Sequence, residues 1–175
     1  DIVAGIEAAG ANELTVHART KRQGYRPPVC WDAIAEAREL VSLPIIANGD
    51  IWSVDDAFRC LAVTGCDALM LGRGVLCRPD LPRLIAAAAI CGEPGESLHW
   101  PDITPLLANF FELNLLHYDA RNAGNPLKQW LVYLRGYFPQ AALLFEQIKR
   151  LRAPEDIRSI LQQALPPIAA KRCAA

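Results

Sequence analysis

The sequence lacks the features that would place it at once in a membrane, secreted or metal-binding class. Its longest apolar run, Leu84 to Cys91, is far too short to span a bilayer. No basic stretch followed by an apolar core opens the chain, so no signal peptide is predicted. The six cysteines form no C-x-x-C pair and the three histidines no H-E-x-x-H, so we expect neither a disulfide framework nor a metal site. Scattered thiols without a secretion signal fit a reducing cytosol, and a cytoplasmic protein is predicted.

The chain also lacks an ordinary beginning. It starts at Asp1 and its single methionine is Met70, so we expect a fragment or a processed product. The composition is that of a folded protein, with 52% hydrophobic and 21% charged residues. Its 175 residues are enough for one ordinary domain or two small ones.

The net charge of −1 conceals an uneven distribution of charge along the chain. Residues 1–99 carry nine basic and 13 acidic side chains, whereas residues 100–175 carry nine and six. The stretch 120–152 holds six basic side chains and one acidic side chain, Glu146. Such a local surplus can attract a phosphate backbone, although solvated helix faces would look the same. A second basic group lies in the acidic half: Arg19, Lys21, Arg22 and Arg26.

The first half of the chain alternates short apolar runs with stretches of helical periodicity. Near-continuous apolar strands separated by helices are typical of a parallel sheet, here expected to be covered by helices on both sides. Ser53, followed three residues later by Asp56, indicates a capping box at the start of one helix. The predicted strands are 14–17, 45–47 and 68–71, and the predicted helices are 32–41, 53–63 and 81–90.

The second half of the chain is predicted to be a small helical bundle. Residues 93–101 are rich in helix breakers and predict a hinge between a domain of residues 1–92 and a domain of residues 102–175. Four helices are predicted, over 102–119, 127–137, 140–151 and 154–164. One of them carries an apolar stripe at i, i+3, i+4 and i+7, so its members are expected in the core: Leu127, Trp130, Leu131 and Leu134.

Polar and glycine-rich loops follow the three predicted strands, at the place where α/β folds carry their chemistry. Glycine lets a backbone approach an anion closely, and Arg73 adds a forked cation suited to phosphate oxygens. These loops predict a phosphate site, although tight turns alone would also use glycine. His17 is either a ligand contact or a structural residue. The loops are His17-Ala18-Arg19-Thr20, Asn48-Gly49-Asp50 and Gly72-Arg73-Gly74.

Three motifs in order carry a resemblance to a known family. They are Leu14-Thr-Val-His-Ala-Arg-Thr20 with Gln23-Gly-Tyr25 and Trp31, Pro44-Ile-Ile-Ala-Asn-Gly-Asp-Ile51, and Thr64-Gly-Cys-Asp-Ala-Leu-Met-Leu-Gly-Arg-Gly74. Together they resemble the later part of the tRNA-dihydrouridine synthase family. A further run, Lys128-Gln-Trp-Leu-Val-Tyr-Leu-Arg135, is similar to the bacterial C-type subfamily, whose target is the D-loop uridine at position 16.

The resemblance implies a fold, cofactors and a partner. The fold is the last three βα units of a TIM (β/α)8 barrel, followed by an all-helical tRNA-recognition domain. In this family NADPH reduces FMN, reduced FMN passes a hydride to C6 of a flipped-out uracil, and a cysteine protonates C5. Neither a membrane nor a protein partner is expected.

The resemblance also assigns residues to two sites. The flavin ring would face His17, and the FMN phosphate would lie against Gly72 and Arg73. The positions that would line the cofactor are His17, Asn48, Gly49, Asp50, Gly72 and Arg73. The positions that would touch tRNA are Tyr25, Lys128, Tyr133 and Lys149.

The chain departs from the family pattern in ways that affect catalysis and specificity. The Asn-x-Gly-Cys-Pro motif of the catalytic cysteine is absent and Cys66 lies in a different motif, so no catalytic residue is assigned. Pro126 stands where the C-type pattern has an arginine, a role that Arg121 could take over. Because three strands cannot close an eight-stranded barrel, we expect these 175 residues alone to bind FMN poorly and to reduce no tRNA.

Two other functions remain open at this point. One is a small-molecule flavin- or phosphate-binding barrel oxidoreductase, similar to dihydroorotate dehydrogenases, although a small substrate needs no basic helical extension. The other is a non-catalytic RNA-binding remnant, which the missing cysteine motif favours. Salt-sensitive binding to tRNA would separate the first from a tRNA-modifying enzyme, because phosphate contacts release counterions.

Overall fold

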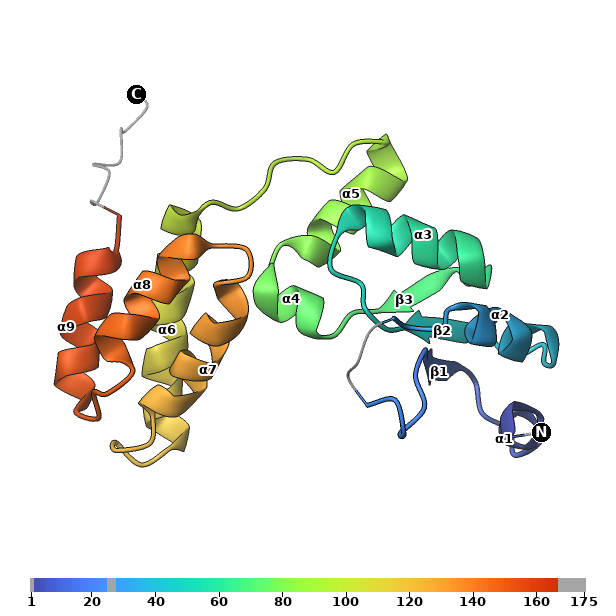
Figure 1. The fold of residues 1–175 in the computed structure, drawn as a ribbon, viewed down its shortest axis with the longest axis horizontal. Coiled ribbons are helices and arrows are strands. Elements are labelled where there is room, and N and C mark those ends of the chain that lie inside the picture. Colours follow the sequence, from blue (N-terminus) through green and yellow to red (C-terminus); the bar gives the residue numbers. More distant parts are fainter. Residues whose placement is uncertain (1, 25–27, 167–175) are drawn as a thin grey trace, which may run out of the picture. The chain divides into compact units, whose positions relative to one another are not determined.

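The chain divides after Glu96 into two compact units, which are described separately. The computed structural model describes residues 2–24 and 28–166 (Figure 1). The boundary falls within residues 93–101, and the roles assigned to the two domains stay predictions. Across the described residues, the helices are too short or too polar to cross a membrane.

The first unit is built on a three-stranded parallel sheet with the strand order β1-β2-β3. Its strands are β1 (Leu14–His17), β2 (Ile45–Asn48) and β3 (Ala68–Met70), which confirms the three predicted strands to within one residue. The register pairs His17 with Asn48, and Asn48 with Met70. The three strands therefore end side by side at one edge of the sheet.

The two helices that connect the strands pack on the same face of the sheet, whereas the sequence predicted cover on both faces. Ile34 and Cys60, from the helices that connect the strands, are buried in one core with Ile45 and Ala47. On the opposite face the side chain of Met70 is 48% exposed. Right-handed crossovers between consecutive parallel strands place their helices on the same side, which explains the difference. The helices are α1 (Ile2–Ala8), α2 (Asp32–Glu39), α3 (Val54–Thr64), α4 (Arg73–Cys77) and α5 (Leu81–Cys91).

Ser53 starts α3 in the way that the capping motif predicts. Its hydroxyl oxygen accepts a hydrogen bond from the Asp56 amide at 3.0 Å. The Asp56 carboxylate accepts one from the Trp52 amide at 3.1 Å, one residue earlier than in a standard capping box. Gly65 ends the helix with a φ of 64°, a left-handed conformation that glycine adopts without strain. Both ends of α3 are thus fixed by local sequence.

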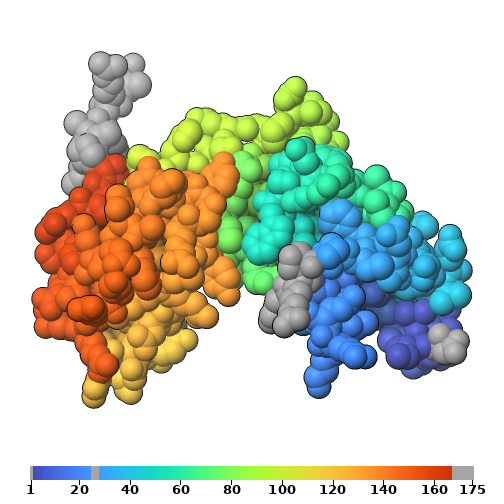
Figure 2. Space-filling view, in the orientation of Figure 1, coloured from blue at the N-terminus to red at the C-terminus, as the bar shows by residue number. Residues whose placement is uncertain are grey.

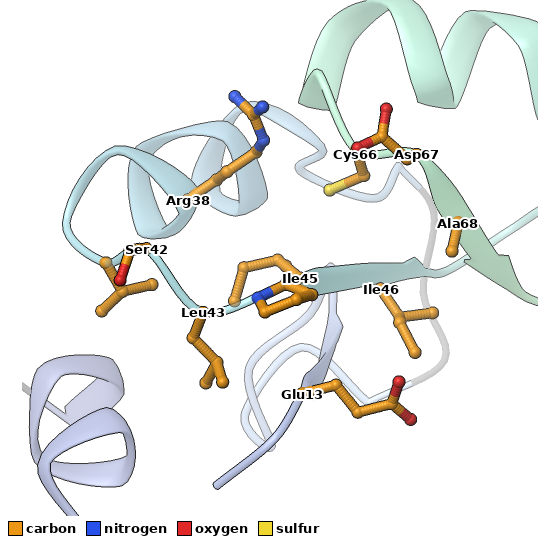
Figure 3. A pocket seen from close by; sticks show the side chains of 11 residues that line it. Glu13, Arg38, Ser42, Leu43, Ile45, Ile46, Cys66, Asp67 and Ala68 are labelled. Atoms are coloured by element: carbon orange, nitrogen blue, oxygen red, sulfur yellow. The ribbon is translucent and has the colours of Figure 1, made fainter. Parts of the chain in front are cut away.

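A hollow of about 450 Å³ opens at the amino ends of β2 and β3 (Figure 3). Ile46 and Ala68 line it from the sheet, and Glu13 and Arg38 contribute opposite charges. Chemistry in parallel α/β folds belongs to the carboxyl ends of the strands, whereas the amino ends serve stability. We therefore assign a structural role, and not a chemical one, to the hollow.

The second unit is a helical bundle around an apolar core. Figure 2 shows one face of its outer surface, in yellow to red. Leu127, Leu131 and Leu134 are fully buried, which confirms the predicted stripe. Trp130 is half-buried and meets Phe110 edge to face, with ring centroids 5.1 Å apart. The helices are α6 (Trp100–His117), α7 (Gly124–Leu134), α8 (Pro139–Ile148) and α9 (Pro154–Ala164).

Some helix boundaries differ from the prediction. The helix expected from residue 102 begins at Trp100, because Asp102 accepts a hydrogen bond from the His99 amide at 2.8 Å. The helix expected over 154–164 is confirmed. Two short helices, α1 and α4, were not predicted, and α4 begins inside the Gly72-Arg73-Gly74 segment that was expected to be a loop.

Gly74 lies where α4 meets the segment that follows β2. A Cβ built on Gly74 would lie 2.1 Å from the carbonyl oxygen of Ile51. Both groups belong to the backbone, so an added methyl group could be relieved only by moving the chain. The close approach of these two segments therefore requires glycine at position 74.

Gly74→Ala should lower the free energy of unfolding of the first unit by about 1–3 kcal/mol through overpacking. Urea denaturation followed by circular dichroism measures the change. Gly5→Ala is the matched control, because a Cβ there has nothing within 4 Å and alanine favours the α1 helix. An unchanged unfolding midpoint for Gly74→Ala would show that the Ile51 contact is not required.

Candidate functional site

A chain of hydrogen bonds joins the carboxyl ends of the three strands. Nδ1 of His17 lies 2.6 Å from Oδ1 of Asn48, and Nδ2 of Asn48 donates to the Met70 carbonyl at 2.7 Å. Because the amide nitrogen faces a carbonyl, the amide oxygen faces the ring, and Nδ1 of His17 must carry a proton. The exposed imidazole is thereby fixed in orientation, and Nε2 is the ring nitrogen left for a ligand.

An ion cluster joins the loops that follow the same strands. Arg19 forms a forked contact with Asp50, in which Nη1 donates to Oδ1 at 3.0 Å and Nη2 to Oδ2. Nη2 of Arg73 lies 3.4 Å from Oδ1 of the same carboxylate. The side chain of Arg19 is 1% exposed, whereas that of Arg73 is 34% exposed. Arg19 therefore serves as an internal partner of Asp50, and Arg73 is the cation that a ligand can reach.

The turn after β2 adopts an unusual backbone conformation. Asp50 has a φ of 47°, and it is the one non-glycine residue with positive φ in the described part of the chain. Gly49 has a φ of 138°, and a Cβ there would lie 3.1 Å from Cβ of Ala18. Nε1 of Trp31 donates to the Gly49 carbonyl at 2.9 Å. Gly49 thus packs directly against the loop after β1 and sets the direction of Asp50.

Arg73 and Gly72 border open space at the end of β3. A Cβ on Gly72 would meet nothing within 4 Å. The Arg73 guanidinium lies 5.3 Å from the centroid of the Trp52 ring, so the indole supports it from one side. A half-exposed, supported guanidinium beside an uncovered glycine fits an anion with the size and charge of a phosphate.

The sequence placed Arg19 both in the loop after the first strand and in a basic group, but it predicted no partner for Arg19 and did not single out Trp52 for this site. The available signal was positional, because Arg19 and Asp50 occupy equivalent places after neighbouring strands, two residues beyond the register pair His17 and Asn48. A count of charges cannot reveal which carboxylate pairs with an arginine that lies 31 residues away in the sequence.

Cys66 lies at the other end of the sheet, just before β3. Its side chain is buried, and its sulfur is 4.0 Å from the Thr64 carbonyl oxygen. Burial, and then the neighbouring Cys66, raise the pKa of the Cys60 thiol to about 11. Both cysteines therefore belong to the core. Within residues 2–24 and 28–166, no group of His, Cys, Asp and Glu side chains suits a metal ion.

The second unit holds a basic pocket of about 450 Å³. It brings together Lys128 and Lys149, two of the positions that the family resemblance assigns to tRNA. Tyr133 does not line it, because a residue five positions after Lys128 faces another side of the helix. Tyr25 lies outside the described residues. The lining residues are Arg121, Asn122, Asn125, Lys128, Lys149, Arg150 and Arg152.

The two pocket lysines differ in their surroundings. Nζ of Lys128 donates to the carbonyl oxygen of Leu151 at 2.6 Å, and burial followed by the charge of Arg152 lowers the pKa of the Lys128 amine. Lys149 is more exposed and forms an ion pair with Glu146. Lys149 can thus turn to a ligand by breaking a surface ion pair, which contributes little to stability.

Comparison with known proteins agrees with the motifs. A family model described as dihydrouridine synthase (Dus) matches residues 1–164. The tRNA-dihydrouridine(16) synthase of Aquipseudomonas alcaligenes is 40% identical over 95% of this chain and 52% of that protein. The enzymes of that name from Pseudomonas syringae and Escherichia coli K12 are 41% and 39% identical, over 86% and 93% of this chain and 47% and 50% of those proteins.

The chain spans about half the length of the curated relatives that it matches. The matched residues include both the three strand-end loops and the basic pocket. The resemblance seen in the motifs is confirmed: this chain belongs to the dihydrouridine synthase family.

Proposed function

We propose that this chain is part of a flavin-dependent tRNA-dihydrouridine synthase. The reaction would reduce the 5,6 double bond of a D-loop uridine, at position 16, with NADPH as reductant and FMN as carrier. Two features of the same chain carry the proposal. One is the cluster at the strand ends, in which Arg73 can bind an anion, and the other is a pocket lined by five basic side chains and no acidic one. A tRNA substrate would place the protein in the cytoplasm.

The strand-end cluster would hold the cofactor. FMN, when bound, supplies a ring that accepts and donates hydride. Arg73 would bind its phosphate, and Gly72 leaves room for the phosphate oxygens. Two arginines against one carboxylate leave the cluster with a net positive charge, which suits a dianion. Asp50 itself would act by holding both arginines in place.

His17 and Asn48 would meet the flavin ring. Asn48 fixes the proton on Nδ1 of His17, so Nε2 points to the ligand as an acceptor in the neutral ring. A ring held in one tautomer and one orientation can position a polar edge of the cofactor with little loss of entropy on binding. We assign no catalytic residue to this chain, whose part is to hold the cofactor and the tRNA.

The basic pocket would hold the tRNA backbone. Phosphate contacts supply affinity and position without reading sequence, which is what a modifying enzyme needs to present one nucleotide. The target uridine must leave its stack before its ring can be reduced, so the rest of the tRNA must be held firmly while it moves. A small-molecule oxidoreductase would have no use for this pocket.

A fusion of the first half of the Pseudomonas syringae relative to this chain should produce dihydrouridine at position 16. Expression in a bacterial strain that lacks its own position-16 enzyme, followed by nucleoside mass spectrometry and primer extension, tests this outcome. A folded, FMN-loaded fusion that yields no dihydrouridine would show that the chain is not part of such an enzyme.

Arg73→Gln in the same fusion should reduce FMN affinity by roughly 10- to 100-fold, since a hydrogen bond to a charged group contributes about 1.5–3 kcal/mol. Flavin fluorescence titration measures the change. Arg38→Gln removes an equal charge at the amino end of the sheet and should leave FMN binding unchanged. Equal FMN affinity in both variants would refute the assignment of Arg73 to the phosphate.

Binding of an unmodified tRNA transcript to this chain should weaken steeply with salt, and Lys149→Gln should reduce the salt slope by about one. Glu146→Gln should strengthen binding, because it releases Lys149 from its ion pair. Fluorescence anisotropy between 50 and 300 mM KCl measures both. Weaker binding by Glu146→Gln would contradict the assignment of Lys149 to the tRNA.

A further inference from the structure

The basic pocket holds more cations than the family resemblance assigns to tRNA. Arg121 reaches it from the turn before α7, and Arg150 and Arg152 reach it from the turn between α8 and α9. Among the described residues, none of these three arginines forms an ion pair with a carboxylate. Cations gathered without a counterion repel one another, and an anion in the pocket would relieve that repulsion.

Lys128 is engaged differently from the arginines. Its ammonium donates to the carbonyl oxygen of Leu151 at 2.6 Å, and Leu151 stands between Arg150 and Arg152 in the chain. The bond therefore ties α7 to the middle of the turn that carries both arginines. The bond uses one of the three N–H donors of the ammonium and directs that donor at the turn.

Gly124 makes room for this arrangement at the start of α7. A Cβ there would lie 2.7 Å from Cδ1 of Ile157 and 3.6 Å from Cε of Lys128. The missing side chain thus allows Ile157 of α9 and the stem of Lys128 to pack in the same place. Gly124 thus leaves space for Ile157 at the start of α7, and the Lys128 hydrogen bond holds the turn just before α9.

We propose that the pocket binds a phosphate of the RNA backbone through Arg121, Arg150 and Arg152, while Lys128 is a positioning residue that holds the turn carrying two of them. This inference rests on the proposed tRNA-binding function and changes the role of Lys128 within it. The forked guanidinium groups suit phosphate oxygens, and Asn122 and Asn125 add amide donors at the rim.

Binding of an unmodified tRNA transcript to this chain tests the arginines. Arg150→Gln and Arg152→Gln should each weaken binding several-fold and reduce the salt slope by about one, as expected for the loss of one phosphate contact. Arg135→Gln is the matched control, because Arg135 is exposed at the opposite end of α7 and does not line the pocket. Salt slopes equal to that of the unsubstituted chain would overturn the proposal.

A double-mutant cycle tests Lys128. Lys128→Met keeps the apolar stem and removes the donor, so it should weaken binding in the unsubstituted chain by loosening the turn. In the Arg150→Gln/Arg152→Gln background the same change should have less than a twofold effect, because the groups that it positions are gone. An equal loss in both backgrounds would show that Lys128 contacts the RNA itself. Thermal unfolding by circular dichroism verifies that each variant folds.

A second measurement separates this proposal from the proposed function. Titration with inorganic phosphate, followed by the NMR signals of the arginine Nε–H groups, should give saturable shifts at Arg150 and Arg152 and none at Arg135. If tRNA binds but the pocket variants behave like the control, tRNA recognition stands and the pocket proposal fails. If phosphate saturates the pocket but tRNA does not bind, the anion site stands and its RNA ligand is wrong. Loss of both signals overturns both proposals.

Discussion

Asp50 follows the second strand of the sheet and accepts hydrogen bonds from Arg19, which follows the first, and from Arg73, which follows the third. One carboxylate thus fixes the relative positions of three loops. Arg19 is almost completely buried, and a buried guanidinium requires a partner of opposite charge. The left-handed conformation of Asp50 and the close packing of Gly49 against Ala18 follow from aiming this carboxylate at both arginines.

The sequence is sufficient to predict the strands and most helices, because their signals are local. Apolar runs mark 14–17, 45–47 and 68–71, and a hydroxyl three residues before a carboxylate marks the start of α3. Short elements escape prediction, since a five-residue helix such as α4 has too few positions to show a period. The placement of both connecting helices on one face of the sheet follows from the handedness of the connections, which periodicity does not encode.

The candidate sites are less visible in the sequence than the fold. Motif positions identify His17, Asn48 and Arg73, but the pairing of Arg19 with Asp50 spans 31 residues and leaves no local pattern. In the second unit a count of charges reveals a basic stretch without showing which members converge. The pocket draws on two separate turns and one helix, and only packing brings Arg121 to Arg150 and Arg152.

The in-register ends of the three strands also set a length. His17, Asn48 and Met70 stand in one row, one residue from each strand. Since neighbouring strands lie about 4.8 Å apart, the row measures about 10 Å from end to end. A flat, rigid ligand of that length can touch every strand once, whereas a shorter one leaves a strand uncovered. The register of the sheet thus limits which rigid ligands can contact all three strand ends at once.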